Sequence, residues 1–146
     1  MWDLRATALP VWDYRGHTQD VTACKFLYPT STQQGSSSPL VTCCKDGSLR
    51  VWDAMLPSSV HSSSTVARER AALQTSKIYT SLTQLYNDEE DKQQLQRDMT
   101  FCASCFDGSI ECLSLTRDPD EQTADWSLQL LTSTPPHVDP SQIEEE

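Results

Sequence analysis

The chain has 146 residues and 37% hydrophobic side chains, enough for one modest core and too short for a large multidomain enzyme. Its formal net charge is −10, because residues 1–73 hold 7 basic and 6 acidic side chains whereas residues 74–146 hold 4 and 15. An acidic surface repels phosphate groups and anionic lipids, so we expect neither nucleic acid nor a membrane as partner. The start Met1-Trp2-Asp3 lacks the basic region of a signal peptide. We therefore expect an intracellular protein of the cytoplasm or nucleus.

Two β-hairpins are predicted by strand-like segments that meet at Asp-Gly turns. Residues 39–53 carry β-branched and aromatic side chains on both sides of Asp46-Gly47, a combination typical of strand, turn and strand. Residues 99–115 repeat this pattern 61 residues later, with Asp107-Gly108 at the turn. Spacing of this kind predicts an array of repeated units.

One segment resembles a complete WD40 repeat, the unit of a β-propeller. Gly16-His17 stands before the expected first strand, Asp46-Gly47 joins the next two strands, and Trp52-Asp53 closes the last one. The resemblance implies an all-β fold, a partial WD40-type β-propeller over residues 1–131 with four-stranded antiparallel blades and long inserted loops. One such loop is expected at residues 27–39, which are polar and show no hydrophobic periodicity.

The resemblance implies a regular blade at about residues 10–53 and a divergent blade at about residues 54–115. The divergent copy has Leu113-Ser114 where Trp-Asp would stand, and no Gly-His pair. Residues 66–74 occupy the place of an outer strand, but their Ala, Arg, Glu and Leu side chains favour a helix, so both alternatives stay open. The other elements expected in this half are a strand at 77–86, a charged loop at 87–98, a strand at 125–131 and a disordered acidic tail at 132–146.

In the regular blade the resemblance implies a buried hydrogen-bond chain that joins an indole, a hydroxyl, an imidazole and a carboxylate. The residues at these places are Trp52, Thr42, His17 and Asp46. An indole only donates, a hydroxyl and a neutral imidazole do both, and a carboxylate only accepts, so each member supplies what the next one lacks. We expect these four side chains to form one structural network.

The second copy lacks two of the groups that such a network needs. Ala103 replaces the hydroxyl and Leu113 replaces the indole, so we expect these two side chains to line an apolar gap. Asp107 is then left with local backbone partners. About two blades leave two blade faces open, and we expect those faces to be apolar.

Six cysteines lie at positions 24, 43, 44, 102, 105 and 112. Without a secretory signal, a disulfide framework is the weaker explanation. Cys102 and Cys105 have the Cys-x-x-Cys spacing of a zinc knuckle, but residues 101–106 predict a strand, where side chains three apart point to opposite faces. We favour packing over metal binding, and expect neither a metal nor another cofactor.

Catalysis finds no support in the sequence, because the three histidines are scattered and no nucleophile elbow is present. We expect a non-catalytic scaffold that binds other proteins, since a propeller supplies surfaces rather than reactive groups. Trp2-Asp3-Leu4-Arg5 is similar to the Trp-Asp-x-Arg signature of substrate receptors of cullin-RING ubiquitin ligases. That similarity implies a partner-binding role for Arg5, which would contact a ligase adaptor. A third alternative is a fragment of an enzyme whose active residues lie outside this chain.

Overall fold

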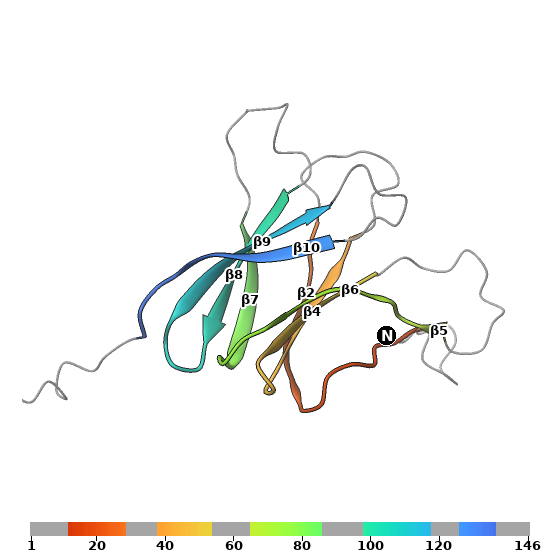
Figure 1. Ribbon diagram of the computed structural model, residues 1–146, viewed down its shortest axis with the longest axis horizontal. Helices are drawn as coiled ribbons and strands as arrows, with labels where there is room; N and C mark the ends of the chain where they lie inside the picture. Colours follow the sequence, from red (N-terminus) through yellow and green to blue (C-terminus); the bar gives the residue numbers. More distant parts are fainter. Residues whose placement is uncertain (1–11, 29–37, 54–64, 86–97, 118–125, 137–146) are drawn as a thin grey trace, which may run out of the picture.

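The computed structural model describes residues 12–28, 38–53, 65–85, 98–117 and 126–136. Within these ranges the regular structure consists of strands, which confirms the all-β prediction. No helix in the described ranges is long and apolar enough to cross a membrane. Two four-stranded antiparallel sheets lie side by side (Figure 1), with strand β2 against β7 and strand β6 against β10.

The first sheet is built around the hairpin at Asp46-Gly47. Its strands are β2 (Val21–Phe26), β3 (Leu40–Cys44), β4 (Ser48–Trp52) and β6 (Glu69–Gln74), in that order across the sheet. Strand β6 falls in the segment for which helix and strand were both open. Its pairing with β4, in which Leu49 lies opposite Leu73, outweighs the helical propensity of its side chains. A short parallel pair of β1 (Trp12–Asp13) and β5 (Thr65–Val66) lies beside this sheet.

The second sheet repeats this order of pairing. Its strands are β7 (Tyr79–Leu85), β8 (Asp98–Cys105), β9 (Ile110–Arg117) and β10 (Trp126–Ser133), with β10 next to β9. The last strand of each sheet, β6 or β10, lies beyond the expected end of its blade at residue 53 or 115. Backbone pairing places these strands in the sheets, although the repeat motif ends before them. Residues 132–136 are also not a disordered tail, since β10 runs to Ser133 and Thr134 N donates to Ile110 O at 2.8 Å. Residues 137–146 lie outside the described ranges.

Equivalent positions in the two hairpins are 61 residues apart. Thr42 lies opposite Arg50 in the first sheet, and Ala103 lies opposite Glu111 in the second. Each turn contains a glycine with φ of 81°, a left-handed conformation that other residues adopt only at a cost. At Gly47 a Cβ atom would also lie 2.2 Å from the Thr75 carbonyl oxygen, so the turn needs glycine for two reasons.

The main core lies between the two sheets and takes side chains from both. Ala103 and Leu113, expected beside an apolar gap, are fully buried members of this packed core. The prediction of a gap is therefore wrong, because other apolar side chains of this core enclose both residues. The buried members are Leu27, Val41, Cys43, Leu49, Val51, Tyr79, Met99, Phe101, Ala103, Cys105, Leu113 and Leu115.

A glutamine ties the second sheet to the backbone of the first. The amide of Gln84, on β7, donates to the Tyr28 carbonyl oxygen at 2.6 Å and accepts from the Tyr28 N–H at 2.9 Å. Gln84 is 6% exposed, so both bonds are sheltered from water. The side chain therefore pairs with Tyr28 much as a neighbouring strand would.

On the two central strands of the second sheet, β8 and β9, the face that points away from the first sheet is polar. Strand alternation places Met99, Phe101 and Ala103 in the core and the intervening side chains of β8 on the other face. The intervening side chains on β8 and β9 are Thr100, Cys102, Ser104, Cys112, Ser114 and Thr116. The expectation of an apolar open face is therefore wrong for the two central strands of this sheet, where hydroxyl and thiol groups dominate.

Candidate functional site

The first sheet brings together the four residues expected in the hydrogen-bond chain. Trp52 Nε1 donates to Thr42 Oγ1 at 2.7 Å, and His17 Nε2 lies 2.6 Å from the same oxygen. On the other side of the ring, His17 Nδ1 lies 2.9 Å from Ser48 Oγ, which donates to Asp46 Oδ1 at 2.6 Å. The side chains come from the segment before β2, from β3, from the turn and from β4.

Ser48 is the member that sequence reasoning missed. The expected link between His17 and Asp46 runs through its hydroxyl group. The signal was present, since Asp-Gly-Ser occurs in both hairpins and Ser48 is 2% exposed. A buried hydroxyl beside a turn carboxylate needs a polar partner, and the imidazole provides it.

The groups at the two ends of this hydrogen-bond network, the Trp52 indole and the Asp46 carboxylate, fix the direction of every hydrogen bond between them. The pKa of Asp46 is held well below its usual range, first by the Ser48 hydroxyl and then by backbone N–H groups, so this carboxylate only accepts. Ser48 must then donate to it and accept from His17 Nδ1–H, which leaves Nε2 to accept from Thr42. Burial and then the Arg50 charge lower the pKa of His17, in keeping with this neutral ring.

Further contacts hold the segment before β2 against the hairpin. Asp46 Oδ2 accepts from Thr18 N at 3.1 Å and from Thr18 Oγ1 at 2.9 Å. The ring of Tyr14 meets Trp52 edge-on, with centroids 5.6 Å apart. At Gly16 a Cβ atom would lie 3.1 Å from the Trp52 ring and 3.0 Å from Arg50, so glycine permits this close approach.

His17, Cys44 and Asp46 place one donor atom each within 4.8 Å of one another, a spacing that suits a metal ion. Both ring nitrogens of His17 already take part in hydrogen bonds, and so do both carboxylate oxygens of Asp46. A cation would have to replace these hydrogen bonds to gain His17 and Asp46 as ligands. The arrangement is therefore structural in chemistry rather than a preformed metal site.

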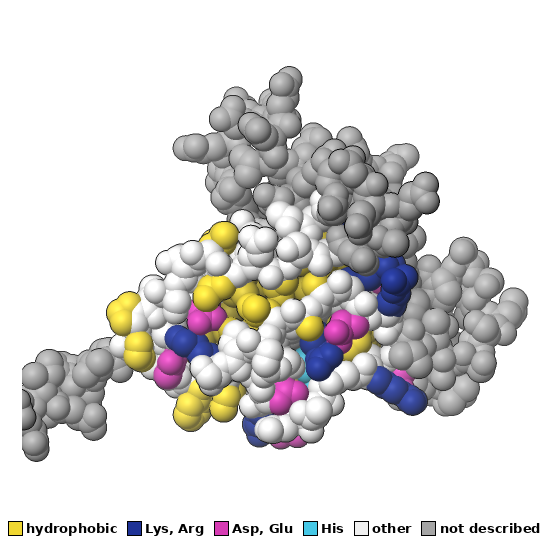
Figure 2. Space-filling model, in the orientation of Figure 1, with side chains coloured by type: hydrophobic (Ala, Val, Ile, Leu, Met, Phe, Trp, Pro, Cys, Tyr) yellow, Lys and Arg dark blue, Asp and Glu magenta, His cyan; other side chains and the backbone are white. Residues whose placement is uncertain are grey.

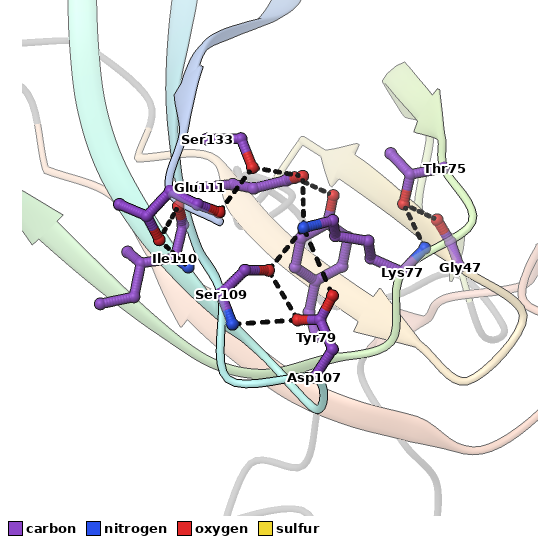
Figure 3. Close-up of polar contacts among 10 residues, drawn as sticks. Gly47, Thr75, Lys77, Tyr79, Asp107, Ser109, Ile110, Glu111 and Ser133 are labelled. Atoms are coloured by element: carbon purple, nitrogen blue, oxygen red, sulfur yellow. Dashed lines mark hydrogen bonds and ion pairs between the residues drawn. The ribbon is translucent and has the colours of Figure 1, made fainter. Parts of the chain in front are cut away.

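The second sheet carries a charged cluster at the equivalent place (Figure 3). Lys77 Nζ donates to Ser109 Oγ and lies 3.5 Å from Asp107 Oδ2 and 3.6 Å from Glu111 Oε1. Tyr79 donates its hydroxyl hydrogen to Glu111 Oε2 at 2.6 Å. Asp107 thus has side-chain partners in Ser109 and Lys77, which corrects the expectation of local backbone partners alone.

This charged cluster encloses a carboxylate. Glu111 is 4% exposed. Burial of Tyr79, and then its hydrogen bond to Glu111, raise the pKa of the tyrosine. Sequence reasoning missed Lys77, Tyr79 and Glu111 because they come from two separate segments. The available signal was a glutamate on the same strand face as Leu113 and Leu115, since a buried acid requires a donor or a cation.

Apolar side chains are exposed at the hairpin-turn end of the second sheet. Phe106 is 81% exposed and Ile78 is 39% exposed, and Phe106 N donates to the Ile78 carbonyl oxygen at 2.8 Å. Figure 2 shows hydrophobic side chains projecting at this end of the molecule. The charged cluster supports the same turn through Asp107, so these side chains sit on a well-anchored loop.

Arg5 and its motif lie outside the described residues. Residues 9–53 match the family model "WD domain, G-beta repeat". No curated protein matches the chain. Residues 9–53 are therefore a WD40 repeat, and the two four-stranded sheets have the form of β-propeller blades.

Proposed function

We propose that this chain is a non-catalytic scaffold that binds other proteins through the hairpin-turn end of its blades. WD40 repeats support protein interaction in general, and the exposed Phe106 carries the proposal for this chain. Phe106 is 81% exposed beside a turn that is held by hydrogen bonds between Asp107 and Ser109, and aromatic side chains, Phe included, are enriched at protein interfaces. Ile78 beside it extends the apolar contact.

The chemistry of the first blade favours binding over catalysis. A general base needs a ring nitrogen that can reach a substrate. His17 is the one histidine among the described residues, and both of its nitrogens are held inside the blade. His17 therefore has a structural role, and an enzymatic function would need residues other than this histidine.

The test compares two apolar-to-polar substitutions in the full chain. Phe106→Ser should reduce co-purification of bound proteins from cell extracts by at least about tenfold, as expected for loss of a central aromatic contact. Leu131→Ser is the matched control, since Leu131 is 56% exposed on the outer strand β10. Circular dichroism checks that both variants stay folded. An equal loss for both variants, or none for Phe106→Ser, would contradict the proposal.

A second candidate is a substrate receptor of a cullin-RING ubiquitin ligase. It rests on the motif Trp2-Asp3-Leu4-Arg5, in which Arg5 would pair with a carboxylate or carbonyl group of a ligase adaptor. Arg5→Ala should then abolish adaptor co-purification. Arg15→Ala is the control, because this exposed arginine pairs with Asp13 inside the chain. Equal adaptor signals in wild type and Arg5→Ala would remove this candidate.

We also propose that the protein lies inside the cell, in the cytoplasm or nucleus. All six cysteines are free thiols, which suits a reducing compartment. Fractionation of cells that express the tagged chain tests this, and recovery from the secretory pathway would contradict it.

A further inference from the structure

Two cysteines face each other on the open side of the second blade. Cys102 on β8 and Cys112 on β9 occupy directly opposite register positions, and their Sγ atoms lie 3.0 Å apart. Both side chains are partly exposed, whereas the nearby Cys105 is buried in the core between the sheets. The two thiols that are in contact are thus also within reach of small solutes.

The two sulfur atoms lie close to the separation that a disulfide bond requires. A disulfide has sulfurs about 2.05 Å apart, so the two sulfurs need to approach by about 1 Å. Directly opposite residues of antiparallel strands have Cβ atoms about 4.5–5.5 Å apart, slightly more than the 3.5–4.5 Å typical of disulfides. A bond formed here pulls against the sheet, and strained, exposed disulfides are the readily reduced ones.

We propose that Cys102 and Cys112 are a redox modification site, which forms a reversible disulfide by exchange with a low-molecular-weight disulfide such as oxidised glutathione. One protein thiolate attacks the glutathione disulfide and releases one glutathione thiolate. The second protein thiolate attacks the resulting mixed disulfide and releases the other. The protein loses two electrons and two protons, and two glutathione thiols carry them away.

The surroundings set the rate and the effect of this exchange. Burial, and then the contact with Cys112, raise the pKa of Cys102 to about 11, so attack by the Cys102 thiolate is slow at neutral pH and accelerates as the pH rises. The bond would join the two strands on either side of the turn that carries Asp107. Closing this loop restricts the unfolded chain, so the oxidised protein melts at a higher temperature than the reduced one.

The test maps the thiols of the full chain after equilibration at graded ratios of reduced to oxidised glutathione. The tryptic peptide 98–117 contains Cys102, Cys105 and Cys112. Under oxidising conditions we expect this peptide to lose two hydrogens and to accept one alkyl label, at Cys105, rather than three. Added dithiothreitol should restore three labels.

Two variants distinguish a Cys102–Cys112 disulfide from pairings that involve Cys105. Cys105→Ser should leave the two-hydrogen loss unchanged, whereas Cys112→Ser should trap glutathione on Cys102 as a stable mixed disulfide. Three labels at every glutathione ratio, or a label retained at Cys102 instead of Cys105, would overturn the proposal. The wild-type peptide map decides the matter even where a variant fails to fold.

Discussion

Replacing Ser48 by alanine removes the one oxygen that joins His17 to Asp46. The variant leaves His17 Nδ1–H without its acceptor at 2.9 Å and takes from Asp46 its shortest donor, at 2.6 Å. An unpaired buried donor costs about 1–3 kcal/mol. Because the imidazole is only partly buried and Asp46 keeps the Ser48 backbone N–H, we expect about 1–2 kcal/mol. This corresponds to a melting temperature roughly 3–8 °C lower for a chain of this size.

The second blade supplies a matched control at the equivalent position. Ser109→Ala removes the same pair of bonds, to Asp107 and Lys77. Lys77 keeps Glu111 as an ionic partner and water can reach Asp107, whose side chain is 44% exposed. We expect a loss below about 1 kcal/mol. Urea unfolding followed by tryptophan fluorescence measures both variants in the full chain. A Ser48→Ala protein as stable as wild type, or less affected than Ser109→Ala, would refute this account of the hydrogen-bond chain.

Three further perturbations test other features of the two blades. Gly47→Ala should lower stability by at least about 1–3 kcal/mol in thermal melts, because its φ of 81° and the Thr75 carbonyl oxygen both oppose a Cβ atom. Tyr79→Phe should cost about 1–3 kcal/mol in urea unfolding, since Glu111 Oε2 loses its 2.6 Å donor. The folded-state pKa of His17 lies below the unfolded value of about 6.5, so its contribution is complete above that pH and declines as the pH falls towards the folded pKa. Unfolding free energies measured from pH 7.5 to 5 should therefore decrease, and His17→Gln should flatten this decrease.

Local sequence signals predicted the hairpins because each hairpin depends on residues close to its turn. The hydrogen bonds around Trp52 were instead expected from the resemblance to a WD40 repeat, since His17 is 25 residues from Thr42 in the sequence. Asp46-Gly47 and Asp107-Gly108 specify their turns directly, and both glycines have the same positive φ. Strand β6 was ambiguous because its strand conformation comes from pairing with β4, a long-range contact that its helix-favouring side chains do not encode.

The charged cluster of the second blade was not predictable in the same way. Lys77 does not occupy the sequence position that corresponds to His17, yet its long side chain reaches Ser109 and two carboxylates. An acid such as Glu111 is usually a surface residue, and only its neighbours across the sheet reveal that it is buried. Motif comparison could show which groups the second blade had lost, but not which groups replaced them.

The hydrogen bonds between the Gln84 amide and Tyr28 couple the unfolding of the two blades. Separating the two blades exposes the Tyr28 N–H and carbonyl groups together with the side chain that pairs with them, in addition to the apolar core. Neither blade can therefore open alone without breaking sheltered polar contacts on the other. Partly unfolded species with one intact blade should be scarce, and amide hydrogens of β3 and β8 should exchange with solvent at similar, slow rates governed by a common global opening.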